Sequence, residues 1–110
     1  MKKIKAWLLM ITICVLNCSL QAQVSFTNSS SLSVGSEPAS IVTTDINGDG
    51  KLDLIVANQL SNTISVLTNN GNGGFANYGT YSVGNSPRYL VAADLNGDGK
   101  IDIITANQPF

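Results

Sequence analysis

The chain has 110 residues, with six basic and seven acidic side chains, no histidine and two cysteines. The formal net charge of −1 and the lack of a basic patch argue against a nucleic-acid partner. Because histidine is absent and both cysteines lie near the N-terminus, the usual nucleophile–base pairs are missing, and we expect a non-catalytic protein.

The N-terminal segment is typical of a secretory signal peptide. Lysines at positions 2, 3 and 5 precede the apolar run Ala6–Leu16, and the small residue Ala22 follows as a cleavage position. The apolar run is shorter than the roughly 20 residues that cross a bilayer, so we expect no membrane span. We predict a signal peptide at residues 1–22, a mature chain from Gln23, and bacterial export to a secreted, periplasmic or cell-surface location.

Cys18 offers an alternative processing route. It stands where a bacterial lipoprotein carries its lipidated cysteine, which would give a lipid anchor, but Asn17 precedes it where a small residue is expected. Cleavage after Ala22 is therefore favoured. Both cysteines, Cys14 and Cys18, then leave with the leader, and no disulfide can stabilise the mature chain.

The mature sequence predicts β-strands. Its apolar segments are short and rich in Ile, Val, Thr and Tyr, two of them alternate in polarity, and turn sequences such as NGDG and NNGNGG separate them. No segment combines a helical apolar stripe with caps. We expect an all-β fold built from four-stranded antiparallel meanders, with strands at Ala39–Ile46, Lys51–Asn58, Asn62–Thr68 and Tyr78–Val83.

An acidic motif follows the first of these segments and recurs later in the chain. DINGDGKLD begins at Asp45 and DLNGDGKID at Asp94, and together they contain six of the seven acidic residues. Oxygen side chains on alternate residues converge where the backbone wraps tightly, and the carbonyl at the seventh position can join them. Hard oxygen donors without Cys or His select Ca²⁺ over transition metals. The predicted calcium ligands are Asp45, Asn47, Asp49, the Lys51 carbonyl and Asp53, and in the second copy Asp94, Asn96, Asp98, the Lys100 carbonyl and Asp102.

Two other interpretations of the motif are weaker. A plain β-turn accounts for Gly48 and Gly50 but not for three aspartates kept in place twice. An EF-hand begins with the same D-x-N-x-D-G spacing, but it needs flanking helices and an acid at position 12, where this chain has Val56 and Thr105. A dockerin-type loop fails the same test.

The motif belongs to a longer internal repeat. Shifting Phe26–Gln59 by 49 positions places it on Phe75–Gln108 with 18 identities in 34 pairs. A period of 40 to 50 residues indicates a repeat architecture, and a four-stranded propeller blade is one of the few units of about that size. We therefore predict a β-propeller with a period of 49 residues.

The segment Pro38–Phe75, PASIVTTDINGDGKLDLIVANQLSNTISVLTNNGNGGF, resembles an FG-GAP/VCBS-type repeat, the blade unit of integrin-α-like β-propellers. The resemblance implies a Ca²⁺ ion in the loop between the first two strands of each blade. Such propellers close with about seven blades. This chain would hold, within residues 23–110, the end of one blade (around 26–34), one full blade (38–83) and the start of the next (87–110). We expect a partial propeller, a fragment of a longer protein.

The expected function is that of an exported calcium-binding module for surface adhesion or for binding an extracellular protein or carbohydrate. The alternative is an accessory propeller of a secreted hydrolase or lyase whose catalytic domain lies outside this chain. Tyr78, Tyr81 and Tyr89 can offer a stacking surface for such a ligand, although packing within a blade is the favoured role for aromatic residues in strands. Lys51 and Lys100 are expected to point to solvent.

Overall fold

The computed structural model describes residues 31–108. The predicted signal peptide, both cysteines and most of the predicted strand around 26–34 lie outside these residues. The described part of the chain forms six β-strands and no helix: β1 (Pro38–Thr44), β2 (Asp53–Asn58), β3 (Thr63–Asn69), β4 (Phe75–Ser82), β5 (Pro87–Ala93) and β6 (Asp102–Asn107). Over the same residues, no helix long and apolar enough to cross a membrane is found.

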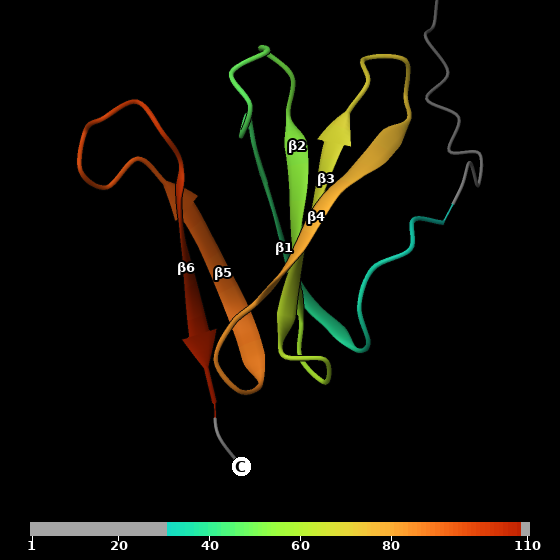
Figure 1. Cartoon of the computed structure of the whole chain (residues 1–110), viewed down its shortest axis with the longest axis vertical. Coiled ribbons are helices and arrows are strands. Elements are labelled where there is room, and N and C mark those ends of the chain that lie inside the picture. Colours follow the sequence, from blue (N-terminus) through green and yellow to red (C-terminus); the bar gives the residue numbers. More distant parts are fainter. Residues whose placement is uncertain (1–30, 109–110) are drawn as a thin grey trace, which may run out of the picture. The chain divides into compact units, whose positions relative to one another are not determined.

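The first four strands form one antiparallel sheet in the order β1-β2-β3-β4, so each strand pairs with its neighbour in the chain (Figure 1). The register of β1 on β2 places Val42 opposite Ile55, and that of β2 on β3 places Ile55 opposite Val66. Directly opposed residues lie on the same face of a sheet, so these three apolar side chains share one face. The predicted four-stranded antiparallel meander is confirmed.

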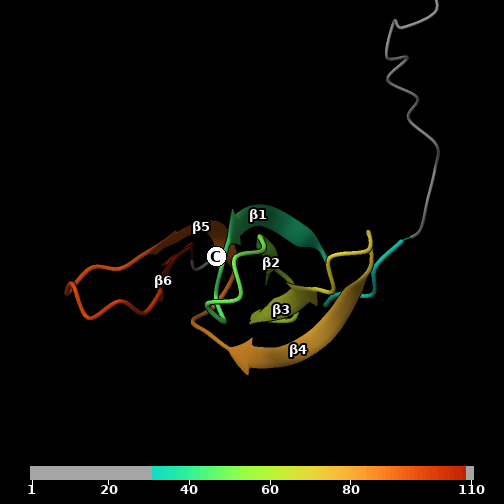
Figure 2. The same ribbon diagram turned by 90° about the horizontal axis from the view of Figure 1, so that it is seen from above.

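The last two strands, β5 and β6, form a second antiparallel sheet. They begin 49 residues after β1 and β2, at Pro87 against Pro38 and at Asp102 against Asp53. Strand β5 lies against β1 and β2 (Figure 2). Both sheets are open: neither closes on itself into a barrel or ring.

The core lies between the two sheets. Ile55, Ala57, Ile64 and Val66 from β2 and β3 are almost fully buried and pack together with Leu90 of β5. Alternation explains why these residues form the core, since every second residue of a strand points to the same face. Because the second sheet supplies Leu90, the hydrophobic effect holds the two repeats together as well as stabilising the first sheet.

The structure corrects several strand bounds. β2 begins at Asp53 rather than Lys51, because the backbone stays in the acidic loop through Leu52. β4 begins at Phe75 rather than Tyr78, because β3 continues to Asn69 and pairs with Phe75 across the turn. A β-bulge in β4 accommodates the extra length.

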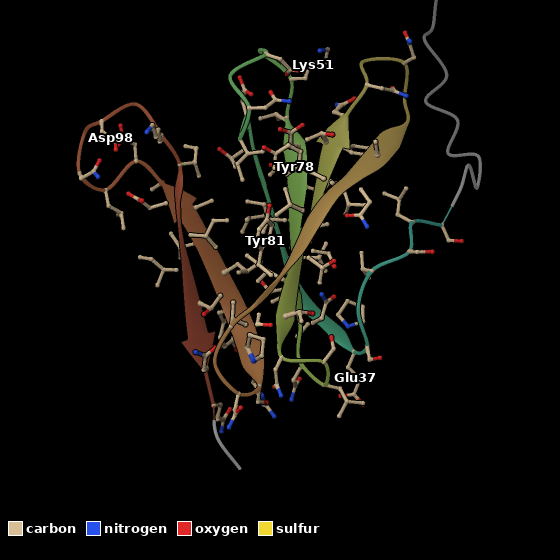
Figure 3. All side chains as sticks on the ribbon, viewed as in Figure 1. Glu37, Lys51, Tyr78, Tyr81 and Asp98 are labelled. Carbon is tan, nitrogen blue, oxygen red and sulfur yellow. The ribbon has the colours of Figure 1, made fainter. Side chains whose placement is uncertain are left out.

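The tyrosines are also placed differently from the favoured prediction. Tyr78, Tyr81 and Tyr89 are 62%, 48% and 70% exposed, so none of them is buried within a blade, although the ring of Tyr81 packs over Gly79 of the same strand. Tyr78 and Tyr81 lie on β4, where no further strand of residues 31–108 pairs with the edge of the sheet (Figure 3). Tyr89 lies on the face of β5 opposite the face that carries Leu90, since neighbouring residues of a strand point to opposite faces.

Candidate metal centre

The two acidic motifs form the loops between β1 and β2 and between β5 and β6. Both loops leave their sheets at the same end, which Figure 3 shows at Lys51 and Asp98. Glu37, the one acidic residue outside the motifs, lies at the opposite end. Six of the seven acidic residues therefore lie at one end of the two sheets.

Asp45 organises the first loop by accepting backbone hydrogen bonds. Its Oδ1 accepts from the N–H of Gly48 at 2.8 Å and of Asp49 at 3.1 Å, and its Oδ2 accepts from Gly50 at 2.7 Å. Three N–H groups of consecutive residues thus converge on one carboxylate. The glycines at 48 and 50 have φ of 76° and 82°, a left-handed conformation that glycine adopts without steric cost. This is why the chain can wrap so tightly here.

The next two oxygen side chains continue the wrapping. The Oδ1 of Asn47 accepts from the N–H of Asp49 at 3.0 Å, and the Oδ1 of Asp49 accepts from the N–H of Lys51 at 2.9 Å. Each is a turn in which a side chain binds the backbone two residues further on. The Nδ2 of Asn47 also donates to the Oδ2 of Asp49 at 3.3 Å. The side chains at the first, third and fifth positions therefore all face the same short stretch of backbone.

The second loop repeats this scaffold. Asp94 accepts from the N–H groups of Gly97 at 2.7 Å, Asp98 at 3.1 Å and Gly99 at 2.8 Å. The bonds from the N–H of Asp98 to Asn96 at 3.0 Å and from that of Lys100 to Asp98 at 2.9 Å recur as well. The hydrogen bond from Gly99, reinforced by those from the neighbouring amides, holds the pKa of Asp94 below its usual range.

The ninth position differs between the loops. Asp53 is fully buried, and its two oxygens accept from the N–H of Ile46 at 3.1 Å and of Asn69 at 2.8 Å. Asp102 is only half-buried, and one of its oxygens accepts from the N–H of Leu95 at 3.2 Å. Asp53 therefore also joins the acidic loop to the β3–β4 turn, a structural role that its motif position did not indicate.

Asn69 is the residue of this end that sequence reasoning missed. Besides donating its N–H to Asp53, it donates from Nδ2 to the carbonyl of Leu52 at 3.1 Å and accepts at Oδ1 from the N–H of Gly71 at 2.8 Å. The turn sequence NNGNGG was the available signal, since asparagine side chains commonly bind nearby backbone in turns. Nothing in the sequence indicated that the turn would reach the acidic loop.

Lys51 is partly exposed to solvent, as predicted, but it also makes an ion pair that the sequence did not indicate. Its Nζ lies 2.8 Å from the Oδ2 of Asp49, and a side chain on Gly71 would meet its stem at 2.9 Å. Lys51 thus lies over the β3–β4 turn, which holds its ammonium group near the loop. The hydrogen bond to Lys51 is the main reason that the pKa of Asp49 lies below its usual range, and the same bond raises the pKa of Lys51. Lys100 is exposed and makes no such ion pair within residues 31–108.

The donor set of each loop consists of oxygen atoms alone. Within residues 31–108, no three His, Cys, Asp or Glu side chains gather closely enough to form a metal-binding group by themselves. Besides the carboxylates, the oxygen atoms that these loops offer are the amide oxygens of Asn47 and Asn96 and the backbone carbonyls. Oxygen ligands of this mixed kind are those that Ca²⁺ takes.

The chain matches the sequence profile of the FG-GAP-like repeat over residues 45–105. This range runs from the first acidic loop into β6 and covers more than half of the chain. Comparison with curated proteins and with solved structures gave no match.

Proposed function

The chain belongs to the FG-GAP-like repeat family, and on that basis we propose that it is an exported, non-catalytic repeat module of the β-propeller type. In this proposal β1 to β4 form one blade and β5 and β6 begin the next. The antiparallel meander and the second sheet that begins 49 residues later support this assignment. The module binds calcium in its two acidic loops and a ligand or partner at the cell surface.

The observation that carries the calcium proposal is the scaffold shared by the two loops. Asp45 and Asp94 each accept hydrogen bonds from three backbone N–H groups at corresponding positions. A plain turn needs one such acceptor, whereas here the side chains at the first, third, fifth and ninth positions of each motif all carry oxygen. When bound, calcium would neutralise the repulsion among these carboxylates.

The proposed calcium ligands are those predicted from the motif. In the first loop they are Asp45, Asn47, Asp49 and the Lys51 carbonyl, with Asp53 closing the site. Asp53 already accepts two N–H groups, but each carboxylate oxygen has a second lone pair. In the second loop the ligands are Asp94, Asn96, Asp98, the Lys100 carbonyl and Asp102.

The proposed ligand is an extracellular protein or carbohydrate. Tyr78 and Tyr81 support this, because β4 presents both aromatic rings to solvent at 62% and 48% exposure. Exposed tyrosines combine an apolar ring with a hydrogen-bonding hydroxyl, a combination suited to sugars and to protein surfaces.

Thermal melting with and without calcium tests the metal proposal. A ligand that binds only the folded state stabilises it by about 1.4 kcal/mol per site at ten times Kd. We expect Kd on the order of 10⁻⁴ to 10⁻³ M, as in other extracellular modules. The melting midpoint of the wild-type chain should rise with Ca²⁺ and fall with chelator, and Mg²⁺ should have a smaller effect.

Asp49→Ala should remove the calcium response of the first loop. Asn77→Ala, on the exposed strand β4, is the matched control and should keep the full response. If chelator leaves the wild-type midpoint unchanged, the carboxylates serve only as turn formers and the calcium proposal fails. The repeat assignment would not be affected by that result.

A further inference from the structure

The sequence contains the dipeptide Asn-Gly at four places. These pairs are Asn47 with Gly48 and Asn96 with Gly97 in the two acidic loops, and Asn70 with Gly71 and Asn72 with Gly73 in the β3–β4 turn. Asparagine is a chemically labile residue, most of all before glycine, because glycine has no side chain to shield its backbone nitrogen. That nitrogen attacks the carbonyl carbon of the asparagine side chain, so the reaction needs these two atoms close together and correctly oriented. Hydrogen bonds that hold either group elsewhere slow it.

The pair at Asn47 is held at both reacting groups. The N–H of Gly48 donates to the Oδ1 of Asp45 at 2.8 Å, which keeps the attacking nitrogen directed at that carboxylate. The side-chain amide of Asn47 accepts from the N–H of Asp49 at 3.0 Å and donates to the Oδ2 of Asp49 at 3.3 Å, which fixes the orientation of its carbonyl group. These bonds oppose any rotation that would bring the nitrogen onto the carbon.

The pair at Asn96 is held in the same way in the second acidic loop. The N–H of Gly97 donates to the Oδ1 of Asp94 at 2.7 Å. The side-chain amide of Asn96 accepts from the N–H of Asp98 at 3.0 Å and donates to its Oδ2 at 3.3 Å. The scaffold of the acidic loops therefore restrains both of their Asn-Gly pairs.

The pair at Asn70 is also held at both groups, by the β3–β4 turn. The N–H of Gly71 donates to the Oδ1 of Asn69 at 2.8 Å. The Oδ1 of Asn70 accepts from the N–H of Asn72 at 2.8 Å and from that of Gly74 at 3.1 Å. The first of the two asparagines in this turn is therefore as restrained as those of the acidic loops.

The pair at Asn72 is held at neither group. Among residues 31–108, no hydrogen bond involves the N–H of Gly73 or the side chain of Asn72. Both residues are exposed, and a Cβ on Gly73 would meet no atom within 4 Å, so this stretch of backbone is not crowded. The nitrogen and the carbonyl carbon can therefore approach each other, and water can reach both.

We propose that Asn72 is the residue at which the folded chain deamidates. The backbone nitrogen of Gly73 gives its proton to water and bonds to the side-chain carbonyl carbon of Asn72, and the side-chain amide leaves as ammonia. A molecule of water then opens the resulting succinimide ring at either carbonyl, to give aspartate or isoaspartate. The new carboxylate stands next to Gly71, over which the stem of Lys51 lies, and so adds negative charge to the acidic end. The proposal does not depend on calcium binding.

Peptide mapping of the purified full-length chain during prolonged incubation at mildly alkaline pH tests this proposal. Cleavage by trypsin after Lys51, Arg88 and Lys100 separates the pairs of the two acidic loops from those of the β3–β4 turn. Fragment ions then distinguish Asn70 from Asn72 and isoaspartate from aspartate. Chelator is present throughout, so that any protection of the acidic loops comes from the protein alone, and circular dichroism checks that the chain stays folded.

The same incubation in denaturant supplies the reference rates. In the unfolded chain the four pairs should react at similar rates, because each is an asparagine followed by glycine. In the folded chain Asn72 should react close to its unfolded rate, whereas the other three should slow by at least about tenfold, as expected where two or more hydrogen bonds must break. Asn72→Gln is the matched control, since the longer side chain closes a ring much more slowly. It should lose the product at this position and leave the other three rates unchanged.

Two results would overturn the proposal. One is reaction in the folded chain at Asn47, Asn70 or Asn96 as fast as at Asn72. The other is a rate at Asn72 that folding lowers as strongly as it lowers the other three, which would show that the turn restrains this pair without hydrogen bonds.

Discussion

The carboxylate of Asp53 accepts a hydrogen bond from the backbone N–H of Asn69 at 2.8 Å, across 16 residues of sequence. Its second oxygen accepts from the N–H of Ile46 at 3.1 Å, and the side chain is fully buried. One side chain therefore connects the acidic loop, the start of β2 and the end of β3. Asp102, the corresponding residue of the second repeat, makes only the equivalent of the Ile46 bond.

This difference predicts unequal effects for two identical substitutions. Asp53→Ala leaves two part-buried backbone N–H groups without an acceptor, at about 1 kcal/mol each, and should lower the free energy of unfolding by about 2 kcal/mol. Asp102→Ala exposes its one N–H partner to water and should cost clearly less. Denaturant unfolding of both variants in the presence of chelator measures the difference without any contribution from metal. Equal losses would show that burial at Asp53 has no energetic role.

The ion pair between Lys51 and Asp49 predicts that the two loops differ in calcium affinity. This prediction depends on the calcium proposal, because the ammonium group must leave the carboxylate before a cation can bind there. An exposed pair of this kind is weak, so Lys51→Gln should raise the calcium affinity of the first loop only about two- to fivefold. Lys100→Gln is the matched control and should change little. Calorimetric titration gives both affinities, and a larger gain from Lys100→Gln would contradict the role assigned to the ion pair.

Gly35 is predicted to be intolerant of even a methyl group. A Cβ at this position would lie 2.6 Å from the Cγ of Asn58, which is fully buried and donates to Thr63 at 3.1 Å and to Ser65 at 3.0 Å. Asn58 cannot move away without breaking these bonds, so Gly35→Ala should cost about 1 to 3 kcal/mol through overpacking.

Gly48→Ala is the comparison for that substitution. A Cβ on Gly48 would meet no atom within 4 Å, so its cost comes only from the left-handed backbone and should be about 1 kcal/mol. Thermal melts of the two variants separate crowding from backbone strain. A smaller loss for Gly35→Ala than for Gly48→Ala would mean that the contact with Asn58 relaxes easily.

Asn62 is predicted to hold the connection between the repeats in place. Its Oδ1 accepts from the N–H of Ser86 at 2.8 Å, and its backbone carbonyl accepts from the N–H of Val83 at 3.0 Å. Asn62→Gly keeps the left-handed φ of 54° accessible but removes the side-chain acceptor. Amide exchange at Ser86 should then quicken roughly five- to tenfold, as expected for one lost hydrogen bond. Unchanged exchange at Ser86 would show that the connection is held by other contacts.

Local sequence determined the features whose partners lie close together along the chain. The acidic loops were predicted correctly as tight turns, because most of their hydrogen bonds join residues two to five positions apart, as Asp45 and Gly50 are. The strands and their antiparallel order were also predictable, because apolar alternation and turn residues act between neighbours in the chain.

Tertiary structure alone decided which of two equivalent residues is more buried or makes more hydrogen bonds. Asp53 and Asp102, Lys51 and Lys100, and Ile55 and Ile104 are identical in type and in local sequence position, yet the first of each pair is more buried or better bonded. Asn69, the last residue of β3, and Gly71, in the turn that follows, account for the first two pairs, and the packing of the second sheet accounts for the third. Burial and long-range hydrogen bonds depend on what lies beside a residue in space, and the 49-residue repeat makes the local sequence around each pair nearly the same. Local pattern therefore could not distinguish the copies, and only the packing of one repeat against the next did.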